Sequence, residues 1–198
     1  GTDLLVKTKL GMVEPDLVVD IKCIPAMHEL QASAAGCKIG AAVSGAELGE
    51  NKTMKKLWPG VVEATNLIGS DQIQSRCTMV GNLCNASPAA DSVPAMIAAG
   101  AKVIIVGNGK RRTIALEKVV TGPGKTSLAK GEVIEAITLP KRPPRSGDAY
   151  LRFTPRTEMD IAVVSAGINL SIARGVIKSA RVVLGAVGPT AMIVPAAA

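Results

Sequence analysis

The chain has 198 residues, of which 47% are hydrophobic and 20% charged, and this composition is that of a globular protein with one domain or two small ones. Aromatic residues make up only 2%, so a stacking platform for single-stranded nucleic acid is not expected despite the net charge of +7. No apolar run of about 20 residues is free of charge, so we expect no membrane span, no signal peptide and a cytoplasmic location.

Apolar periodicity and helix-start signals divide the first part of the chain. They predict two strands and then two helices, at 16–21, 38–43, 45–56 and 59–68. Ser44 precedes Glu47 by three residues, which is the spacing of a capping box at the start of the first helix. Pro59 suits the first turn of the second helix, and Gly69 suits its end.

The second part of the chain is predicted to be mainly strands. The expected elements are a helix, a hairpin, a single strand and a second hairpin, at 92–99, 102–106 with 111–116, 131–139, and 161–172 with 176–184. Asn108 and Gly109 tolerate the positive φ angles of a tight hairpin turn. Because residues 141–148 are rich in proline and charge, we place a domain boundary there, between domains at 1–142 and 148–198.

Basic residues gather at two of the predicted turns, at 110–112 and 141–145. The simpler interpretation is that they are solvated loop charges. The alternative is that they dock against an acidic partner subunit or a nucleotide phosphate.

Residues that usually carry protein-based chemistry are few. The four cysteines form no CxxC pair, so neither a zinc site nor an iron–sulfur cluster is expected in this chain. His28 is the only histidine, and its neighbours supply no catalytic partner and no further metal ligands. Carboxylates occur singly, which argues against a glycosidase-like pair. Any redox chemistry therefore has to come from a bound cofactor.

The most informative segment is residues 68–91, IGSDQIQSRCTMVGNLCNASPAAD, where small and hydrogen-bonding residues replace the aliphatic ones that dominate elsewhere. Thr78, Gly81 and Asn82 bring a hydroxyl, a bare backbone and an amide within five residues. Small residues let main-chain N–H groups approach an anion closely, as in a phosphate-binding nest. The segment therefore predicts a loop that wraps a ligand.

This segment resembles the hallmark IGSxQIRNxGTxGGNLxxASPAAD of the flavin-binding (medium) subunits of molybdenum hydroxylases, the xanthine dehydrogenase and carbon monoxide dehydrogenase family. The opening GTDL resembles that family's AGGTDL turn, and YLRFTPRTEMDIA resembles its YxKxxxRxxMDIA. The resemblance implies an α+β fold, with a two-subdomain FAD-binding domain of the vanillyl-alcohol-oxidase/PCMH-like type and the start of a small α+β C-terminal domain. Relatives continue beyond both ends, so we expect a fragment that lacks N- and C-terminal parts.

The resemblance also implies which residues hold FAD. Two loops are expected to hold the pyrophosphate and ribityl chain, one at Gly1, Thr2, Asp3 and Leu4 and the other at Thr78, Gly81 and Asn82. Asp91 aligns with the acidic residue that binds the adenosine ribose, and Cys84 and Ile134 align with residues that contact the ring. Arg152 and Asp160 are expected where the second domain closes over the flavin. No catalytic residue and no metal ligand is expected in this chain.

Two positions depart from the family hallmark, because Cys77 and Val80 replace glycines. The Cβ of Val80 could crowd the phosphate or resist a positive φ angle. We therefore expect reduced flavin affinity, and we expect Val80→Gly to raise it.

By this resemblance the chain is an FAD-binding electron-transfer subunit of a molybdenum hydroxylase. The implied partners are a large molybdopterin subunit and a small subunit with two-iron two-sulfur clusters, in a dimer of heterotrimers, and the implied electron acceptor is NAD, a quinone or oxygen. One alternative is a stand-alone flavin oxidoreductase, which the lack of an acid/base constellation disfavours. The other is a cofactor-free scaffold subunit of the same kind of complex, which Val80 and the missing ends favour.

Overall fold

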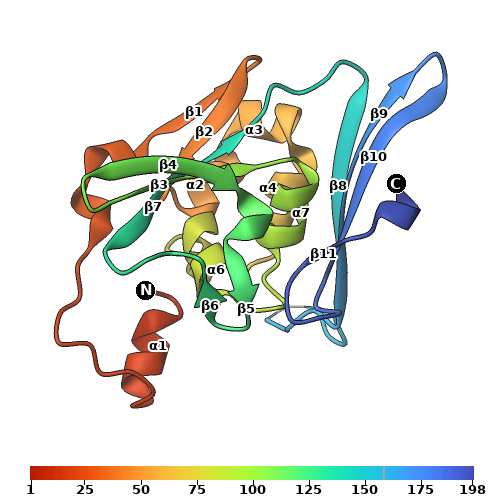
Figure 1. Cartoon of the computed structure of the whole chain (residues 1–198). Helices are drawn as coiled ribbons and strands as arrows, with labels where there is room; N and C mark the ends of the chain where they lie inside the picture. The colour runs from red at the N-terminus through yellow and green to blue at the C-terminus, as the bar shows by residue number, and fades with distance from the viewer. Residues whose placement is uncertain (158) are drawn as a thin grey trace.

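The computed structural model describes residues 1–157 and 159–198, and it is built from two antiparallel sheets with helices between them (Figure 1). The first sheet has the order β1-β2-β7-β3-β4, with strands Leu30–Ser33, Gly36–Gly40, Glu132–Leu139, Lys102–Gly107 and Lys110–Ala115. The second has the order β11-β10-β9-β8, with strands Met192–Ile193, Val176–Gly185, Val164–Ala173 and Ser146–Phe153. A small hairpin joins β5 (Val120–Gly122) to β6 (Lys125–Thr126).

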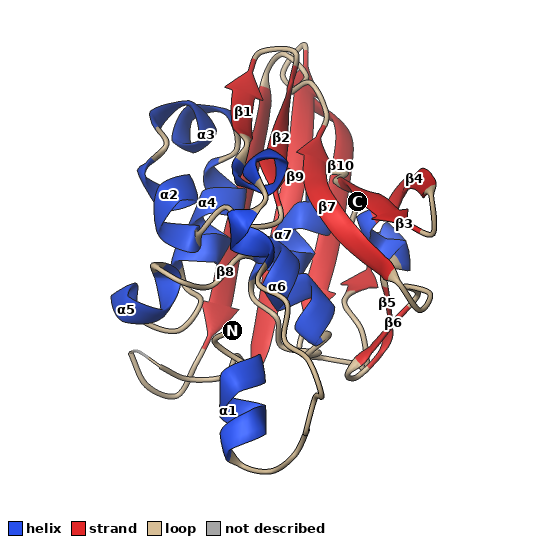
Figure 2. Cartoon of the chain, turned by 90° about the vertical axis from the view of Figure 1, so that its left-hand side faces the viewer, coloured by secondary structure: helices blue, strands red, loops and turns tan. Residues whose placement is uncertain are grey.

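The helices are short. They are α1 (Leu4–Lys9), α2 (Gly45–Glu50), α3 (Lys52–Leu57), α4 (Pro59–Asn66), α5 (Asp71–Gln74), α6 (Met79–Asn85) and α7 (Ser92–Ala98), with 3₁₀ turns at 21–23, 25–28, 116–118 and 195–197. Figure 2 shows α1 projecting from the body of the molecule, whereas α4 and α7 lie inside it. Every residue of α7 is buried, and α4 and α7 both pack on the second sheet.

The second sheet approaches α7 closely because two of its residues are glycines. A Cβ atom at Gly167 would lie 2.6 Å from the backbone of Pro94, and one at Gly185 would lie 2.7 Å from the Pro94 ring. Only glycine fits such a close approach of backbone to backbone. The sheet and the helix therefore share one tightly packed core.

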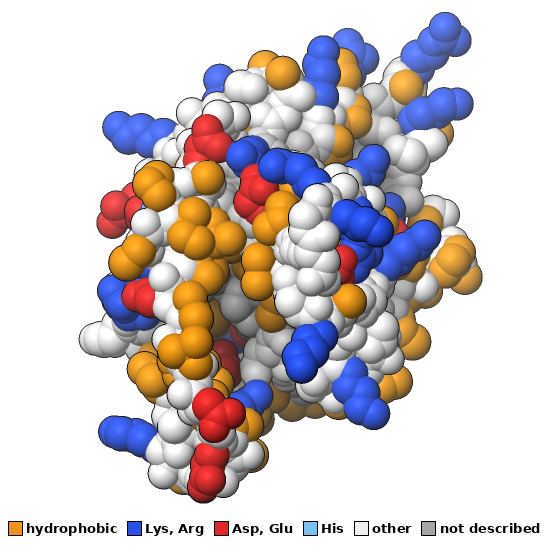
Figure 3. Space-filling view, turned by 60° about the vertical axis from the view of Figure 1, so that its left-hand side comes forward, with side chains coloured by type: hydrophobic (Ala, Val, Ile, Leu, Met, Phe, Trp, Pro, Cys, Tyr) orange, Lys and Arg blue, Asp and Glu red, His pale blue; other side chains and the backbone are white. Residues whose placement is uncertain are grey.

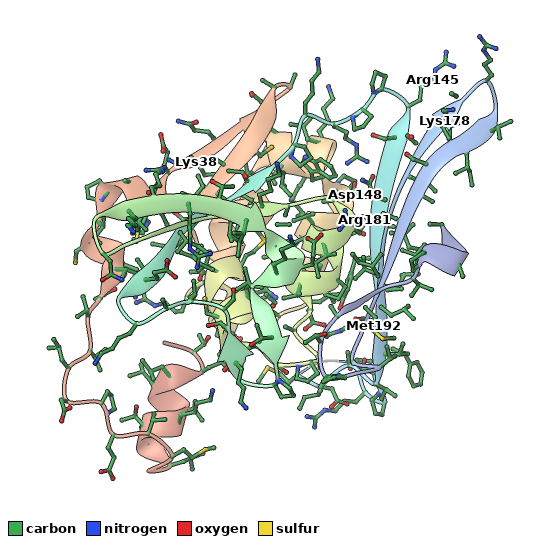
Figure 4. All side chains as sticks on the ribbon, viewed as in Figure 1. Lys38, Arg145, Asp148, Lys178, Arg181 and Met192 are labelled. Atoms are coloured by element: carbon green, nitrogen blue, oxygen red, sulfur yellow. The ribbon has the colours of Figure 1, made fainter. Side chains whose placement is uncertain are left out.

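Residues of the second sheet also bond to α4. The Oδ2 atom of Asp148, on β8 (Figure 4), accepts a hydrogen bond from the backbone N–H of Val61 at 3.2 Å. Its other oxygen pairs with Arg142, and the guanidinium of Arg142 lies 4.8 Å from the centre of the Trp58 ring. These contacts fix the connection between the two sheets against the start of α4.

Several predicted elements are confirmed. Ser44 and Glu47 form the capping box. Asn108 and Gly109 have φ angles of 52° and 69° and turn β3 into β4. The second hairpin runs from β9 to β10, and the predicted helix at 92–99 corresponds to α7.

Other predicted elements are wrong or shifted. No strand forms at 16–21, where Leu17, Val18 and Val19 are exposed and no described strand pairs with them. The helix expected at 45–56 is two helices, because Asn51 ends α2 and its side chain caps α3 by accepting from the N–H of Met54. The strand expected at 38–43 is β2, Gly36–Gly40.

Further elements were missed, among them β1, α5, α6, β5, β6 and β11. α1 forms at the start of the chain, where a loop was expected. β8 begins at Ser146, inside the predicted linker 141–148. No described helix is long and apolar enough to cross a membrane.

Candidate cofactor-binding site

A cavity of about 490 Å³ opens between residues 1–19, here called the N-terminal arm, α6 and the first sheet. Figure 3 shows this face of the molecule hollowed beside the arm. Most of the residues that the sequence assigned to the cofactor line it, namely Gly1, Thr2, Asp3, Leu4, Thr78, Gly81, Asn82, Cys84 and Ile134. The volume is within the usual range for small-molecule sites, roughly 300 to 1,000 Å³.

Segment 68–91 reaches the cavity as helix and not as the expected continuous loop. Thr78 is the N-cap of α6, and its Oγ1 atom accepts from the N–H of Gly81 at 2.9 Å. A Cβ atom at Gly81 would lie 3.1 Å from this Oγ1, so glycine leaves room where the helix faces the cavity. The first N–H groups of a helix have no partner within it. In α6 the N–H of Gly81 bonds to Thr78, and the antiparallel bridge between Ser44 and Thr78 engages the backbone next to Met79, which leaves the N–H of Val80 for a ligand.

Asn82 lines the cavity, and the carbonyl oxygen of its side-chain amide already accepts hydrogen bonds. Its Oδ1 atom accepts from both the N–H and the hydroxyl of Ser92, at 3.2 and 2.7 Å. These two bonds fill the lone pairs of the carbonyl oxygen, so only the NH₂ group of Asn82 is left to donate to a ligand.

The expected strain at Val80 is wrong. Val80 is the second residue of α6, it is absent from the described residues with positive φ, and it is only 7% exposed. Its side chain belongs to the hydrophobic core cluster, although Val80 also lines the cavity. Cys77, the other departure, is likewise buried, and burial raises the pKa of its thiol.

The opposite wall of the cavity is apolar. It includes Ile134 on β7 together with Ile68, Ala41, Ala42, Leu128 and Val133. Cys84 also lines the cavity, and burial raises the pKa of its thiol to about 11, so this side chain is a neutral thiol at pH 7. One wall thus offers hydrogen-bond donors and the other an apolar surface, which suits a ligand with both an anionic part and a ring.

Asp91 and Arg152 do not line this cavity. They pair with each other, with Nη1 of Arg152 3.0 Å from Oδ2 of Asp91, while the Tyr150 hydroxyl donates to Oδ1 of Asp91 at 3.0 Å. Nη1 of Arg152 also donates to the carbonyl of Leu67 at 2.8 Å. Burial raises the pKa of Asp91, although the positive charge of Arg152 opposes this shift.

Asp160 lies farther along the chain, outside the residues that line the cavity. Its Oδ1 accepts from the N–H of Ile161, and its Oδ2 lies 3.6 Å from Nε of Arg156. The described residues contain no group of three or more histidine, cysteine or acidic side chains that could hold a metal ion.

Several residues of the cavity were not assigned to the cofactor from the sequence. Lys7 and Asn85 line it, and Nζ of Lys7 donates to Oδ1 of Asn85 at 2.8 Å. The available signal was helical spacing, because Lys7 follows Asp3 by one turn and lies on the same side of α1.

The fold and this cavity define a flavoprotein domain, and comparison with known proteins agrees. Residues 1–142 match the family described as the FAD binding domain in molybdopterin dehydrogenase, and residues 149–198 match the CO dehydrogenase flavoprotein C-terminal domain. The chain therefore belongs to the family of FAD-binding domains of molybdopterin dehydrogenases, and both the predicted family and the predicted α+β fold are confirmed.

Individual relatives are similar at a moderate level of identity. The xanthine dehydrogenase FAD-binding subunit of Escherichia coli O157:H7 is 27% identical over 192 residues, which is 96% of this chain and 66% of the relative. The carbon monoxide dehydrogenase medium chain of Hydrogenophaga pseudoflava is 27% identical over 97% of this chain and 67% of its own length. The chain thus spans about two thirds of the length of these relatives.

Solved structures show the same likeness. The carbon monoxide dehydrogenase of Hydrogenophaga pseudoflava superposes with a TM-score of 0.94 at 27% identity, over 100% of this chain and 68% of that one. The quinoline 2-oxidoreductase of Pseudomonas putida 86 superposes with a TM-score of 0.88 at 26% identity, over 98% of this chain and 67% of the other.

Proposed function

We propose that this chain binds FAD in the cavity between α1, α6 and β7 and serves as the electron-transfer subunit of a molybdenum-dependent dehydrogenase. The observation that carries the proposal is that one cavity gathers the predicted phosphate-side residues, such as Thr78 and Asn82, opposite an apolar wall at Ile134. A scaffold subunit without cofactor has no use for such an arrangement. The division into domains at 1–142 and 148–198 is part of the proposal.

The chain's own residues bind and orient the cofactor. The N–H of Val80 and the NH₂ of Asn82 donate to the diphosphate, and Gly81 keeps the approach open. The buried side chain of Ile134 and the half-buried one of Cys84 exclude water from one side of the ring. Bound FAD supplies the electron-transfer chemistry, and the protein supplies its position and its electrostatic environment.

The partners follow from the class of enzyme. A large subunit with molybdopterin oxidises the substrate, and a small subunit with two-iron two-sulfur clusters brings the electrons to this chain. The assembly is a dimer of heterotrimers, and the final acceptor is NAD, a quinone or oxygen. We place the complex in the cytoplasm.

The cofactor itself is the first test. The purified chain is titrated with FAD, FMN and riboflavin while flavin fluorescence is followed, and any flavin that co-purifies is released by heat and separated on a column. We expect FAD to bind most tightly and to be the form released. FMN as the sole released flavin, or no binding of any flavin, would overturn the assignment.

Asp91 is the second test, because the proposal assigns it to the adenosine ribose although its carboxylate bonds to Arg152 and Tyr150. Asp91→Ala should weaken FAD binding roughly tenfold or more, which corresponds to about 1.5 to 3 kcal/mol for a hydrogen bond to a charged group. Tyr150→Phe is the matched control, since it removes one bond to Asp91 and keeps the carboxylate. An unchanged dissociation constant for Asp91→Ala removes Asp91 from the site.

Arg152 and Asp160 stay in the proposal as residues that close over the flavin. Arg152→Met and Asp160→Asn should each raise the dissociation constant of FAD, in the same titration. If neither does, closure by this segment is excluded.

A further inference from the structure

The side chain of Lys7 crosses from α1 to α6 at the cavity. Its Nζ atom donates to Oδ1 of Asn85 at 2.8 Å, and Nδ2 of Asn85 donates in turn to Oδ1 of Asp3 at 3.1 Å. All three residues line the cavity. The ammonium group is therefore held in place at the wall by an amide and not by a carboxylate.

The positive charge of Lys7 is not neutralised directly. Lys22, another cation of the cavity, has Asp20 at 3.1 Å, whereas no carboxylate of the described residues lies within 4.0 Å of Nζ of Lys7. A lysine ammonium has three donors, and Asn85 takes one of them. Two N–H groups and one unpaired positive charge thus remain for a ligand in the cavity.

Asn85 has a second role, because it joins the N-terminal arm to the body. Within the part of the chain that the structure describes, the hydrogen bonds that link residues 1–19 to residues beyond 22 both involve Asn85. No residue of α1 is buried, so packing holds this helix only weakly. Asn85 therefore sets the position of Lys7.

We propose that Lys7 is a phosphate-binding residue of this cavity and that Asn85 is its positioning residue. The ligand chemistry is a diphosphate, because its negative charges complement the unpaired ammonium, which Asn85 holds at the end of α6 in the same cavity. This inference rests on the proposed binding of FAD and adds a residue that the family resemblance does not assign. Lys7 contacts the ligand's phosphates and takes no part in electron transfer.

The test compares phosphate-bearing and phosphate-free flavins. The wild-type chain, Lys7→Met, Asn85→Ala and the control Lys9→Met are each titrated with FAD and with riboflavin at low and at high salt. Lys9 is a lysine on the same helix, so its replacement by methionine makes the same change in charge and helix propensity as Lys7→Met. Because Lys9 is exposed and does not line the cavity, it serves as the control. Circular dichroism melts show that each variant folds.

We expect Lys7→Met to raise the dissociation constant of FAD about tenfold, as for the loss of one charge-assisted hydrogen bond, and to weaken its salt dependence. Riboflavin binding should be unchanged, Asn85→Ala should show a smaller effect on FAD, and Lys9→Met should show none. Failure of the wild type to bind FAD overturns the proposed function and this inference together. If the wild type binds FAD and Lys7→Met binds it equally well, only the inference falls. If FAD binding weakens in Asn85→Ala but not in Lys7→Met, the inference is also overturned, because FAD binding would then depend on the position of the arm and not on the charge of Lys7.

Discussion

Helices α1 and α7 are held in the protein by different forces. All seven residues of α7 are buried, and glycines of the second sheet pack against it. None of the six residues of α1 is buried, and its side-chain links to the body run through Asn85. Local stability depends on buried contacts, so α7 belongs to the stable core and α1 to its least stable edge. The cavity thus has a rigid wall, formed by the first sheet and by α6, which packs on α7, and a wall at α1 whose position depends on a few polar bonds.

The strongest way to test this difference is to shorten a buried side chain on α7. Met96 is fully buried, so Met96→Ala should lower the free energy of unfolding by about 2 to 5 kcal/mol through lost burial and a residual cavity. Leu5 on α1 is 61% exposed, and Leu5→Ala should change it by less than about 0.5 kcal/mol. Urea denaturation of both variants measures the two values. Equal losses would show that α1 is packed as firmly as α7.

Val80 belongs to the part of the rigid wall that α6 forms. Since its side chain is in the core, Val80→Gly should cost about 2 to 4 kcal/mol, from lost burial and from the low helix propensity of glycine. FAD binding should not improve, which reverses the sequence-based expectation. Val6→Gly on exposed α1 isolates the backbone effect. Tighter FAD binding by Val80→Gly would mean that the side chain does obstruct the ligand.

The weaker wall should respond to the cofactor. Trypsin cleavage after Lys7 and Lys9 requires α1 to leave the cavity, so FAD at a hundred times its dissociation constant should stabilise the docked arm by up to about 2.7 kcal/mol. Intact-mass measurements over time give the cleavage rate with and without FAD. Cleavage after the exposed Lys178, on the distant β9–β10 hairpin, serves as the internal reference. Equal slowing at both places would point to a general effect on the protease.

Acid should produce the smallest effect, on the rigid wall. The bond to Arg112 holds the pKa of Glu132 at about 2, below its ordinary 4.5. A carboxylate with a lowered pKa in the folded state stabilises the fold above pH 4.5 and loses this contribution as the pH falls toward 2. Arg112→Gln should therefore flatten the fall in unfolding free energy over that interval. Arg145→Gln, at a residue without a described ion pair, should leave the profile unchanged.

Local signals predicted the local structure well. The capping box at Ser44 and the turn at Asn108 depend on neighbours within a few residues, and both form as predicted. The strand expected at 16–21 shows the limit of such signals. Its alternation is genuine, but a strand needs a partner, and Leu17 to Val19 have none among the described strands. Pattern alone cannot supply a neighbour.

The site shows the same limit at longer range. Thr78, Gly81 and Asn82 were found because they are close in sequence and the resemblance to the family hallmark is specific. The ion pair between Asp91 and Arg152 joins residues that are 61 positions apart in the sequence, and no local pattern predicts it. For Lys7 the spacing from Asp3 was a local signal, but its partner Asn85 is 78 residues away and no local pattern predicts that contact.

The hydrogen bond between Asp148 and Val61 determines when α4 becomes stable during synthesis of the chain. Trp58, at the N-cap of α4, offers no side-chain cap, and the carboxylate that accepts the N–H of Val61 comes from 87 residues later. A growing chain leaving the ribosome therefore carries an uncapped α4 until β8 has emerged. Because a short helix without its cap and its packing is marginal in water, α4 becomes secure only when the second sheet arrives. Folding of the first half is in this way completed by the second.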